Sequence, residues 1–219
     1  MIMTKLFLIT ILFAVININD YEPDDKKAVD LLNEVTAKMD SYTSFKLELH
    51  FFIEDMHDAS RKSFEGNAVY KSGNYKLDLM GQVIFTDGKT NWTYLVDADE
   101  VNITDVYDDD ENIMDPKNLL KNFEQEYKVR YISDKFERNR PLVEIDLYPV
   151  KVQDKKYSRI TLRVDKTKKQ IYSIRYVGKD GVNYLIEIHR FNENPDIPDN
   201  EIKFSNSLFP GAEIIDMRD

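Results

Sequence analysis

Residues 83–94 read Val-Ile-Phe-Thr-Asp-Gly-Lys-Thr-Asn-Trp-Thr-Tyr, and this stretch does most to decide the fold. The Asp87-Gly88 pair follows the apolar run 83–86 and precedes a segment in which Trp92, Tyr94 and Val96 alternate with polar residues. Asp-Gly between such runs is a strong hairpin signal, because glycine adopts a positive φ without strain. The stretch therefore predicts an antiparallel hairpin, with Trp92 and Tyr94 on one face of its second strand.

The same alternation extends in both directions along the chain. From Phe45 to Ile53, every odd-numbered residue is apolar, whereas Lys46, Glu48 and His50 occupy the other face. Period two with one polar face is typical of a half-exposed antiparallel strand. Further strands are predicted around 64–71, 75–79, 101–103, 127–132, 143–147, 158–164, 171–177 and 184–191, with a possible short strand at 213–216.

Two segments change to the helical period. In 26–39, the apolar residues fall on one helical face, and acidic residues at the start suit the helix dipole. Asp115-Pro116 is expected to open a second helix, with Leu119, Leu120 and Phe123 as its apolar face. The predicted order is a helix, five or six strands, a second helix and about five strands. Such a long sheet must curl or close, and the two helices are the cover available for its apolar face.

The first residues predict a secretory leader. Lys5 precedes the almost wholly apolar run 6–16, and 17–20 is polar. This is the order of a signal peptide, and the run is shorter than the roughly 20 apolar residues that a spanning helix needs. We expect a signal peptide over 1–19 and a single domain over 20–219, the alternative being that the N-terminal run is a core strand.

Composition and motifs argue against most catalytic and metal-binding classes. A formal net charge of -10 gives no general attraction to nucleic acid, and the absence of cysteine excludes thiolate chemistry. Asp108, Asp110 and Asn112 start like an EF-hand loop, but Ile113 stands where glycine is needed. No nucleophile elbow, phosphate loop or His-rich metal motif occurs. We therefore expect no enzyme activity, no metal and no cofactor.

At this point the chain resembles the outer-membrane lipoprotein carrier family, the LolA-like periplasmic chaperones. The resemblance rests on residues 83–94, on the Gly-containing stretch 65–71, on Asp115-Pro116 before a mid-chain helix and on Leu147-Tyr148-Pro149. It implies a mainly β (α+β) fold, a curled antiparallel sheet forming an incomplete β-barrel covered by a helical lid. It also implies a monomeric carrier in the periplasm, which accepts acylated lipoprotein cargo from an inner-membrane release complex and passes it to an outer-membrane receptor.

One position departs from the family pattern. In well-known members, the turn after the second strand carries a basic residue followed by proline, and that residue is thought to tie the lid to the sheet. Here the stretch is Lys71-Ser72-Gly73, so the basic residue is displaced by one position. The departure leaves open a lid that is controlled differently.

The carrier hypothesis assigns residues to two surfaces. Residues from the alternating strands would form an acyl-chain cavity: Leu47, Leu49, Phe51, Leu77, Leu79, Trp92, Tyr94, Ile145, Leu147, Leu162, Ile174, Ile186 and Ile188. The two helices would form the lid: Leu31, Leu32, Val35, Leu119, Leu120 and Phe123. An acyl chain gains about 0.8 kcal/mol for each buried CH2, so such a site would hold its cargo by apolar area.

Two other hypotheses remain. The same fold with a filled core would be a signalling or binding module that senses a lipoprotein or protein partner without carrying it. A periplasmic hydrolase would need two converging carboxylates. A basic turn at Lys166, Lys168 and Lys169 is interpreted as a solvated hairpin tip, with docking of an acidic partner as the alternative.

Overall fold

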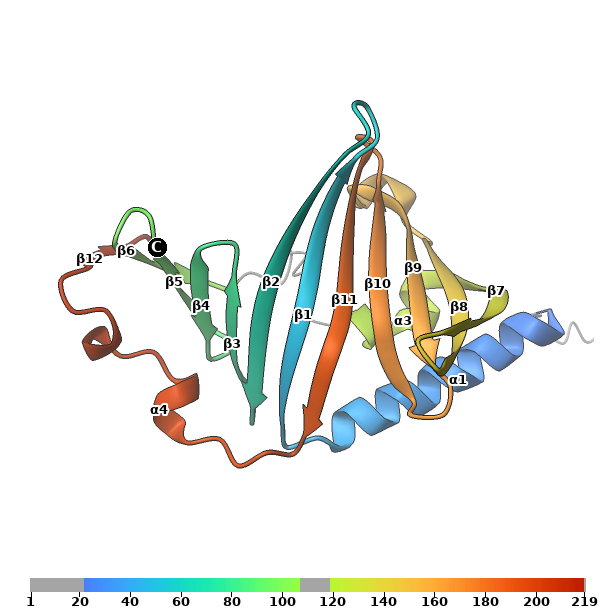
Figure 1. The fold of residues 1–219 in the computed structure, drawn as a ribbon, viewed down its shortest axis with the longest axis horizontal. Helices are drawn as coiled ribbons and strands as arrows, with labels where there is room; N and C mark the ends of the chain where they lie inside the picture. Colours follow the sequence, from blue (N-terminus) through green and yellow to red (C-terminus); the bar gives the residue numbers. More distant parts are fainter. Residues whose placement is uncertain (1–21, 107–118, 219) are drawn as a thin grey trace, which may run out of the picture.

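The computed structural model describes residues 22–106 and 119–218 (Figure 1). The helical elements are α1 Pro23–Ser41, α3 Phe123–Glu126 and α4 Asp199–Ile202, with short 3-10 turns at Val152–Asp154 and Asn206–Leu208. The strands before α3 are β1 Ser44–Asp55, β2 Ser60–Lys71, β3 Asn74–Leu79, β4 Gln82–Thr86, β5 Thr90–Leu95 and β6 Glu100–Asp105. Those after α3 are β7 Tyr127–Glu137, β8 Arg140–Pro149, β9 Tyr157–Asp165, β10 Gln170–Gly178, β11 Val182–Glu193 and β12 Glu213–Asp216.

All twelve strands belong to one open sheet, in the order β12-β6-β5-β4-β3-β2-β1-β11-β10-β9-β8-β7. Consecutive strands pair antiparallel in two runs, and β1 joins the runs by pairing with β11. The short strand β12 adds to β6 in parallel. Because β7 and β12 stand at opposite edges, the sheet does not close, which confirms the predicted mainly β fold with an incomplete barrel.

The Asp87-Gly88 turn forms as predicted between β4 and β5. One carboxylate oxygen of Asp87 accepts the backbone N–H groups of Lys89 and Thr90 at 2.9 and 2.8 Å. Burial alone would raise the pKa of Asp87, but these N–H donors hold it below its ordinary value. Gly88 has a φ of +86°, a conformation that other L-residues adopt only with strain.

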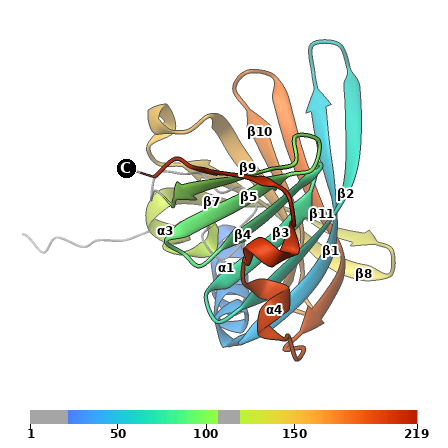
Figure 2. The same ribbon diagram turned by 90° about the vertical axis from the view of Figure 1, so that its left-hand side faces the viewer.

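The two faces of the sheet are covered by different parts of the chain. Helix α1 lies inside the curl of the sheet, while the C-terminal segment with α4 lies across the opposite face of β3 and β4 (Figure 2). We call these the helix-covered face and the outer face. Gly66 of β2 lets the first pack closely, because a Cβ there would stand 2.9 Å from Leu79 Cδ1 and 3.1 Å from Leu49 Cδ1.

The predicted first helix is confirmed within α1, which starts at Pro23 and carries Asp24 and Asp25 in its first turn. Leu119 and Leu120 are helical, whereas the expected helix start at Asp115-Pro116 and the leader over 1–19 lie outside the described residues. Within the ranges 22–106 and 119–218, no helix is long and apolar enough to cross a membrane.

Candidate functional site

The helix-covered face carries one continuous buried apolar cluster. In β1 the alternation places Leu47, Leu49 and Phe51 on this face, each under 10 % exposed. The same cluster contains every strand residue assigned to the cavity except Trp92 and Tyr94: Leu77, Leu79, Ile145, Leu147, Leu162, Ile174, Ile186 and Ile188 as well as the three from β1. The structure thus brings residues from β1, β3 and β8–β11 into one interior.

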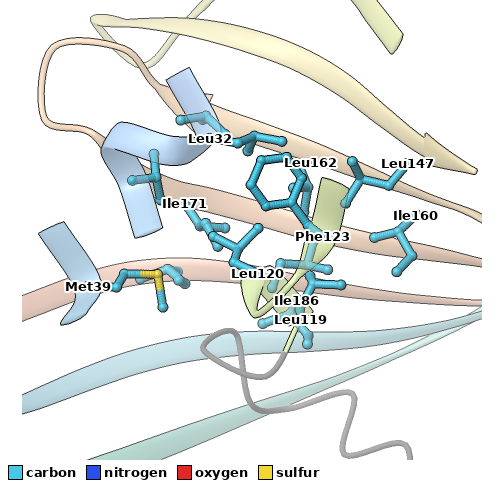
Figure 3. Close-up of a cluster of buried hydrophobic side chains, with 14 of the residues drawn as sticks. Leu32, Met39, Leu119, Leu120, Phe123, Leu147, Ile160, Leu162, Ile171 and Ile186 are labelled. Carbon is cyan, nitrogen blue, oxygen red and sulfur yellow. The ribbon is translucent and has the colours of Figure 1, made fainter. Parts of the chain in front are cut away.

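The helical side of the interior is formed by α1 and residues 119–123. Leu31, Leu32 and Val35 of α1 are buried against the sheet in this cluster. Leu119, Leu120 and Phe123 join them, and Figure 3 shows Phe123 and Leu120 pointing toward Leu162, Ile171 and Ile186 from the strands. All six residues predicted as the lid therefore contact the apolar interior.

Side chains fill this interior in the part of the chain that the structure describes. Leu32, Val35, Ile145, Ile160 and Leu162 each have no exposed surface. Protein interiors pack as densely as organic crystals, so an acyl chain can occupy this volume only if other side chains leave it. The parts that could leave are α1 and residues 119–126, because they are not strands of the sheet.

Trp92 and Tyr94 do not belong to the interior, and the prediction that they line the same face as Leu77 is wrong. Leu77 pairs with Ile84, and Ile84 pairs with Thr93, so Thr93 continues the helix-covered face. Trp92 pairs instead with Phe85 on the outer face. The alternation within one strand does not say which face is which, because a shift of one residue in register exchanges the faces.

The helix-covered face is more polar at this end of the sheet. The side chains that β4, β5 and β6 present to it include Thr86, Asn91, Thr93, Asn102 and Thr104, which are half-buried. The apolar interior therefore spans β1–β3 and β7–β11 and ends where β4 begins.

The C-terminal segment covers the aromatic residues of the outer face. The ring of Phe204 stacks on Trp92 with centroids 5.6 Å apart, and that of Phe209 stacks on Tyr94 at 3.9 Å. Ile197 and Ile202 bury a second small cluster with Val69 of β2. Sequence reasoning missed this cover, although two phenylalanines in a polar tail were a signal that it docks somewhere.

A buried carboxylate fixes the start of α1 to strand β7. Asp25, only 5 % exposed, accepts the backbone N–H of Tyr131 at 2.8 Å and the guanidinium of Arg130 at 2.6 Å. Sequence reasoning counted Asp25 only as a favourable charge for the helix dipole. Its contacts make it the strongest polar tie between the first helix and the sheet.

Exposed side chains make the remaining ties of α1. Asn33 donates to Glu124 of α3 at 3.0 Å, and Glu34 pairs with Lys169 at 2.7 Å. Lys38 donates to the backbone carbonyl of Lys168 at 2.8 Å. The basic turn thus contacts α1, which differs from the expected free hairpin tip. Exposed pairs of this kind contribute little each, about 0–1 kcal/mol.

Lys71 does not tie the helices to the sheet. Its ammonium group donates to the carbonyl of Ile197 and pairs with Asp199 at 3.1 Å. Both partners belong to the C-terminal segment on the outer face. The displaced basic residue therefore holds that segment, and Asp25 with Arg130 holds the first helix.

Metal and carboxylate sites were also considered. Asp108, Asp110 and Asn112 lie outside the described residues. Among residues 22–106 and 119–218, no group of three or more His, Asp or Glu side chains gathers in a geometry that would bind a metal ion.

Comparisons with known proteins follow this geometry. The family model of outer membrane lipoprotein carrier protein LolA matches residues 79–205, more than half of the chain. No curated protein sequence matches significantly.

Three solved structures illustrate the likeness of fold. An uncharacterized conserved protein from Thermus thermophilus is 9 % identical, with a TM-score of 0.56 over 87 % of this chain and 99 % of that one. A putative outer membrane lipoprotein-sorting protein domain from Vibrio parahaemolyticus is 8 % identical, with a TM-score of 0.45 over 81 % and 97 %. A LolA superfamily protein from Nitrosomonas europaea is 11 % identical, with a TM-score of 0.42 over 81 % and 97 %.

Proposed function

The chain belongs to the outer membrane lipoprotein carrier protein LolA family, and from this premise we propose that it carries acylated lipoproteins through the periplasm. In this proposal the acyl chains occupy the apolar interior of the helix-covered face after α1 and residues 119–126 move aside. The cargo comes from an inner-membrane release complex and passes to an outer-membrane receptor. The protein acts as a monomer and catalyses no reaction.

One observation supports the carrier role most directly. The apolar face of the sheet is covered by a helix and a short helical segment, and a second sheet does not pack on it. The polar attachment of α1 consists of one buried carboxylate and a few exposed pairs. A cover attached in this way can be displaced while the strand pairing of the sheet stays intact.

The filled interior supports a second function. If α1 never leaves the sheet, the same chain is a binding module that recognises a lipoprotein or protein partner on its surface. The two functions make opposite demands on α1, since only a carrier needs it to move.

A crosslink between the two covering elements separates these functions. The chain has no cysteine, and Asn33 and Glu124 are exposed and in side-chain contact at 3.0 Å. The double variant Asn33→Cys/Glu124→Cys can be joined by a short bismaleimide, which fixes α1 to α3. Uptake of a triacylated peptide by protein purified without detergent is then measured by native mass spectrometry.

The carrier proposal expects uptake by the open double variant and at least about a tenfold loss once it is crosslinked. The same variant capped with N-ethylmaleimide is the matched control, and it should keep its uptake. Equal uptake with and without the crosslink would mean that the lipid binds elsewhere. No uptake by any form would favour the binding module.

A further inference from the structure

A β-bulge between β1 and β11 gathers polar side chains on the outer face. Glu48 pairs with Arg190 and Leu49 pairs with Ile188, so His189 has no partner in β1. Bulges of this kind redirect side chains and are frequent beside functional sites. Here His189 and Arg190 both line a hollow of about 430 Å3 on the outer face, together with Glu48, His50, Glu65 and Asn67.

Two imidazole rings face each other at this bulge. Nδ1 of His50 lies 3.1 Å from Nε2 of His189, and the ring centroids are 4.0 Å apart. Two nitrogens bound to one Zn²⁺ at about 2.0–2.1 Å stand roughly 3.3 Å apart at a tetrahedral angle and roughly 2.9 Å apart at a right angle. The observed separation falls between these values, so both nitrogens can face one ion with little movement.

A carboxylate stands behind the first ring. Glu65 Oε1 lies 3.5 Å from Nε2 of His50, the ring nitrogen that does not contact His189. Metal-bound histidines commonly donate their second ring N–H to a carboxylate, which fixes the tautomer and directs the lone pair toward the metal. In this arrangement the lone pair of His50 is on Nδ1, on the side of His189.

The charge around the hollow does not oppose a cation. Arg190 is the positive residue lining it, and its guanidinium is paired with Glu48 at 2.6 Å. Glu65 remains 88 % exposed at its side chain and can turn toward an ion in the hollow. Imidazole nitrogens favour Zn²⁺ and Cu²⁺ over Mg²⁺ and Ca²⁺, which take oxygen ligands.

We propose that His50 and His189 bind one divalent transition-metal ion, Zn²⁺ or Cu²⁺, on the outer face, with water completing its coordination. Glu65 positions His50. The site is separate from the apolar interior, because the side chains of Leu47 and Leu49, between which Glu48 lies, point to the other face. Metal binding therefore does not depend on the proposed carrier role.

The chain offers a matched set of variants for the test. It contains three histidines and no cysteine, and His57, the third, is exposed and contacts the carbonyl of Asp180 instead. Untagged protein is titrated with ZnCl2, CuCl2 and MgCl2 by calorimetry. The wild type is compared with His50→Gln, His189→Gln, His57→Gln and Glu65→Gln, and circular dichroism checks that each variant is folded.

The proposal expects one Zn²⁺ or Cu²⁺ per chain and no heat from Mg²⁺ at the same concentrations. Glu65→Gln should weaken binding about tenfold, His50→Gln and His189→Gln by more, and His57→Gln not at all. Electron paramagnetic resonance of the Cu²⁺ form should show coupling to two imidazole nitrogens. Equal binding by His50→Gln, equal binding of Mg²⁺, or no binding at all would each overturn the proposal.

Discussion

The indole ring of Trp92 stacks almost parallel on the ring of Phe204, at an interplanar angle of 9° and a centroid distance of 5.6 Å. Trp92 is the only tryptophan of the chain, so its fluorescence reports on this one contact. The contact joins the C-terminal segment to the outer face of β5.

Phe204→Ala should detach the segment around Trp92. We expect a red shift of the tryptophan emission and a loss of about 1–2 kcal/mol in the free energy of unfolding, since an aromatic pair contributes about 0.5–1.5 kcal/mol beyond the area that it buries. Steady-state fluorescence and urea denaturation measure the two effects. Phe136→Ala is the control, because Phe136 is 72 % exposed and should change neither. An unshifted emission would show that Phe204 does not shield Trp92.

The strands were predictable where one face is apolar and the other is charged. In β1 the charged residues Lys46 and Glu48 alternate with Leu47 and Leu49, so the buried face could be named from the sequence. In β5 the two faces carry Trp92 and Tyr94 on one side and Thr93 and Leu95 on the other. That pattern is apolar on both sides, and the choice depended on register and on the docked tail.

The contacts between distant segments were not predictable. His50 and His189 are 139 positions apart, and they meet only because β1 pairs with β11. The sequence places each of them on a wet face, but their distance depends on the order of strands in the sheet. The same holds for Asp25, whose partners on β7 lie more than a hundred residues away.

Asp25→Ala should loosen α1 from the sheet. It removes the acceptor for the Tyr131 N–H and the partner of Arg130, and an unsatisfied buried polar group costs about 1–3 kcal/mol. Hydrogen exchange in α1 should accelerate, and the free energy of unfolding in urea should fall by about that amount. Asp24→Ala is the matched control: Asp24 is exposed and pairs with Lys27, so we expect a change below about 1 kcal/mol. Equal effects of the two changes would mean that the buried tie is not special.

Leu32→Ala tests the packing of the helix-covered face. Leu32 has no exposed surface, and replacing a buried leucine by alanine removes about 2–5 kcal/mol of stability, depending on how far the site collapses. Leu208→Ala, at a residue that is 41 % exposed, should cost far less. Thermal and urea unfolding measure both variants. A cost for Leu32→Ala well below this range would indicate that the neighbouring side chains move into the space, as expected of a pliable interior.

The attachment of the C-terminal segment should depend on acidity through Asp199. Hydrogen bonds from Lys203 and then from Lys71 lower the pKa of Asp199 below its ordinary value of 3.8. Because the pKa is lower in the folded state, the ionised carboxylate stabilises the fold above about pH 3.8, and this contribution is lost as the pH falls through the folded pKa. Asp199→Asn should therefore be less stable than the wild type at pH 6, and the difference should shrink toward zero below pH 3.8. Urea unfolding followed by Trp92 fluorescence at both pH values measures it. Asp196→Asn, which removes a neighbouring charge, controls for net charge alone. A difference for Asp199→Asn that stays constant with pH would exclude the carboxylate as its cause.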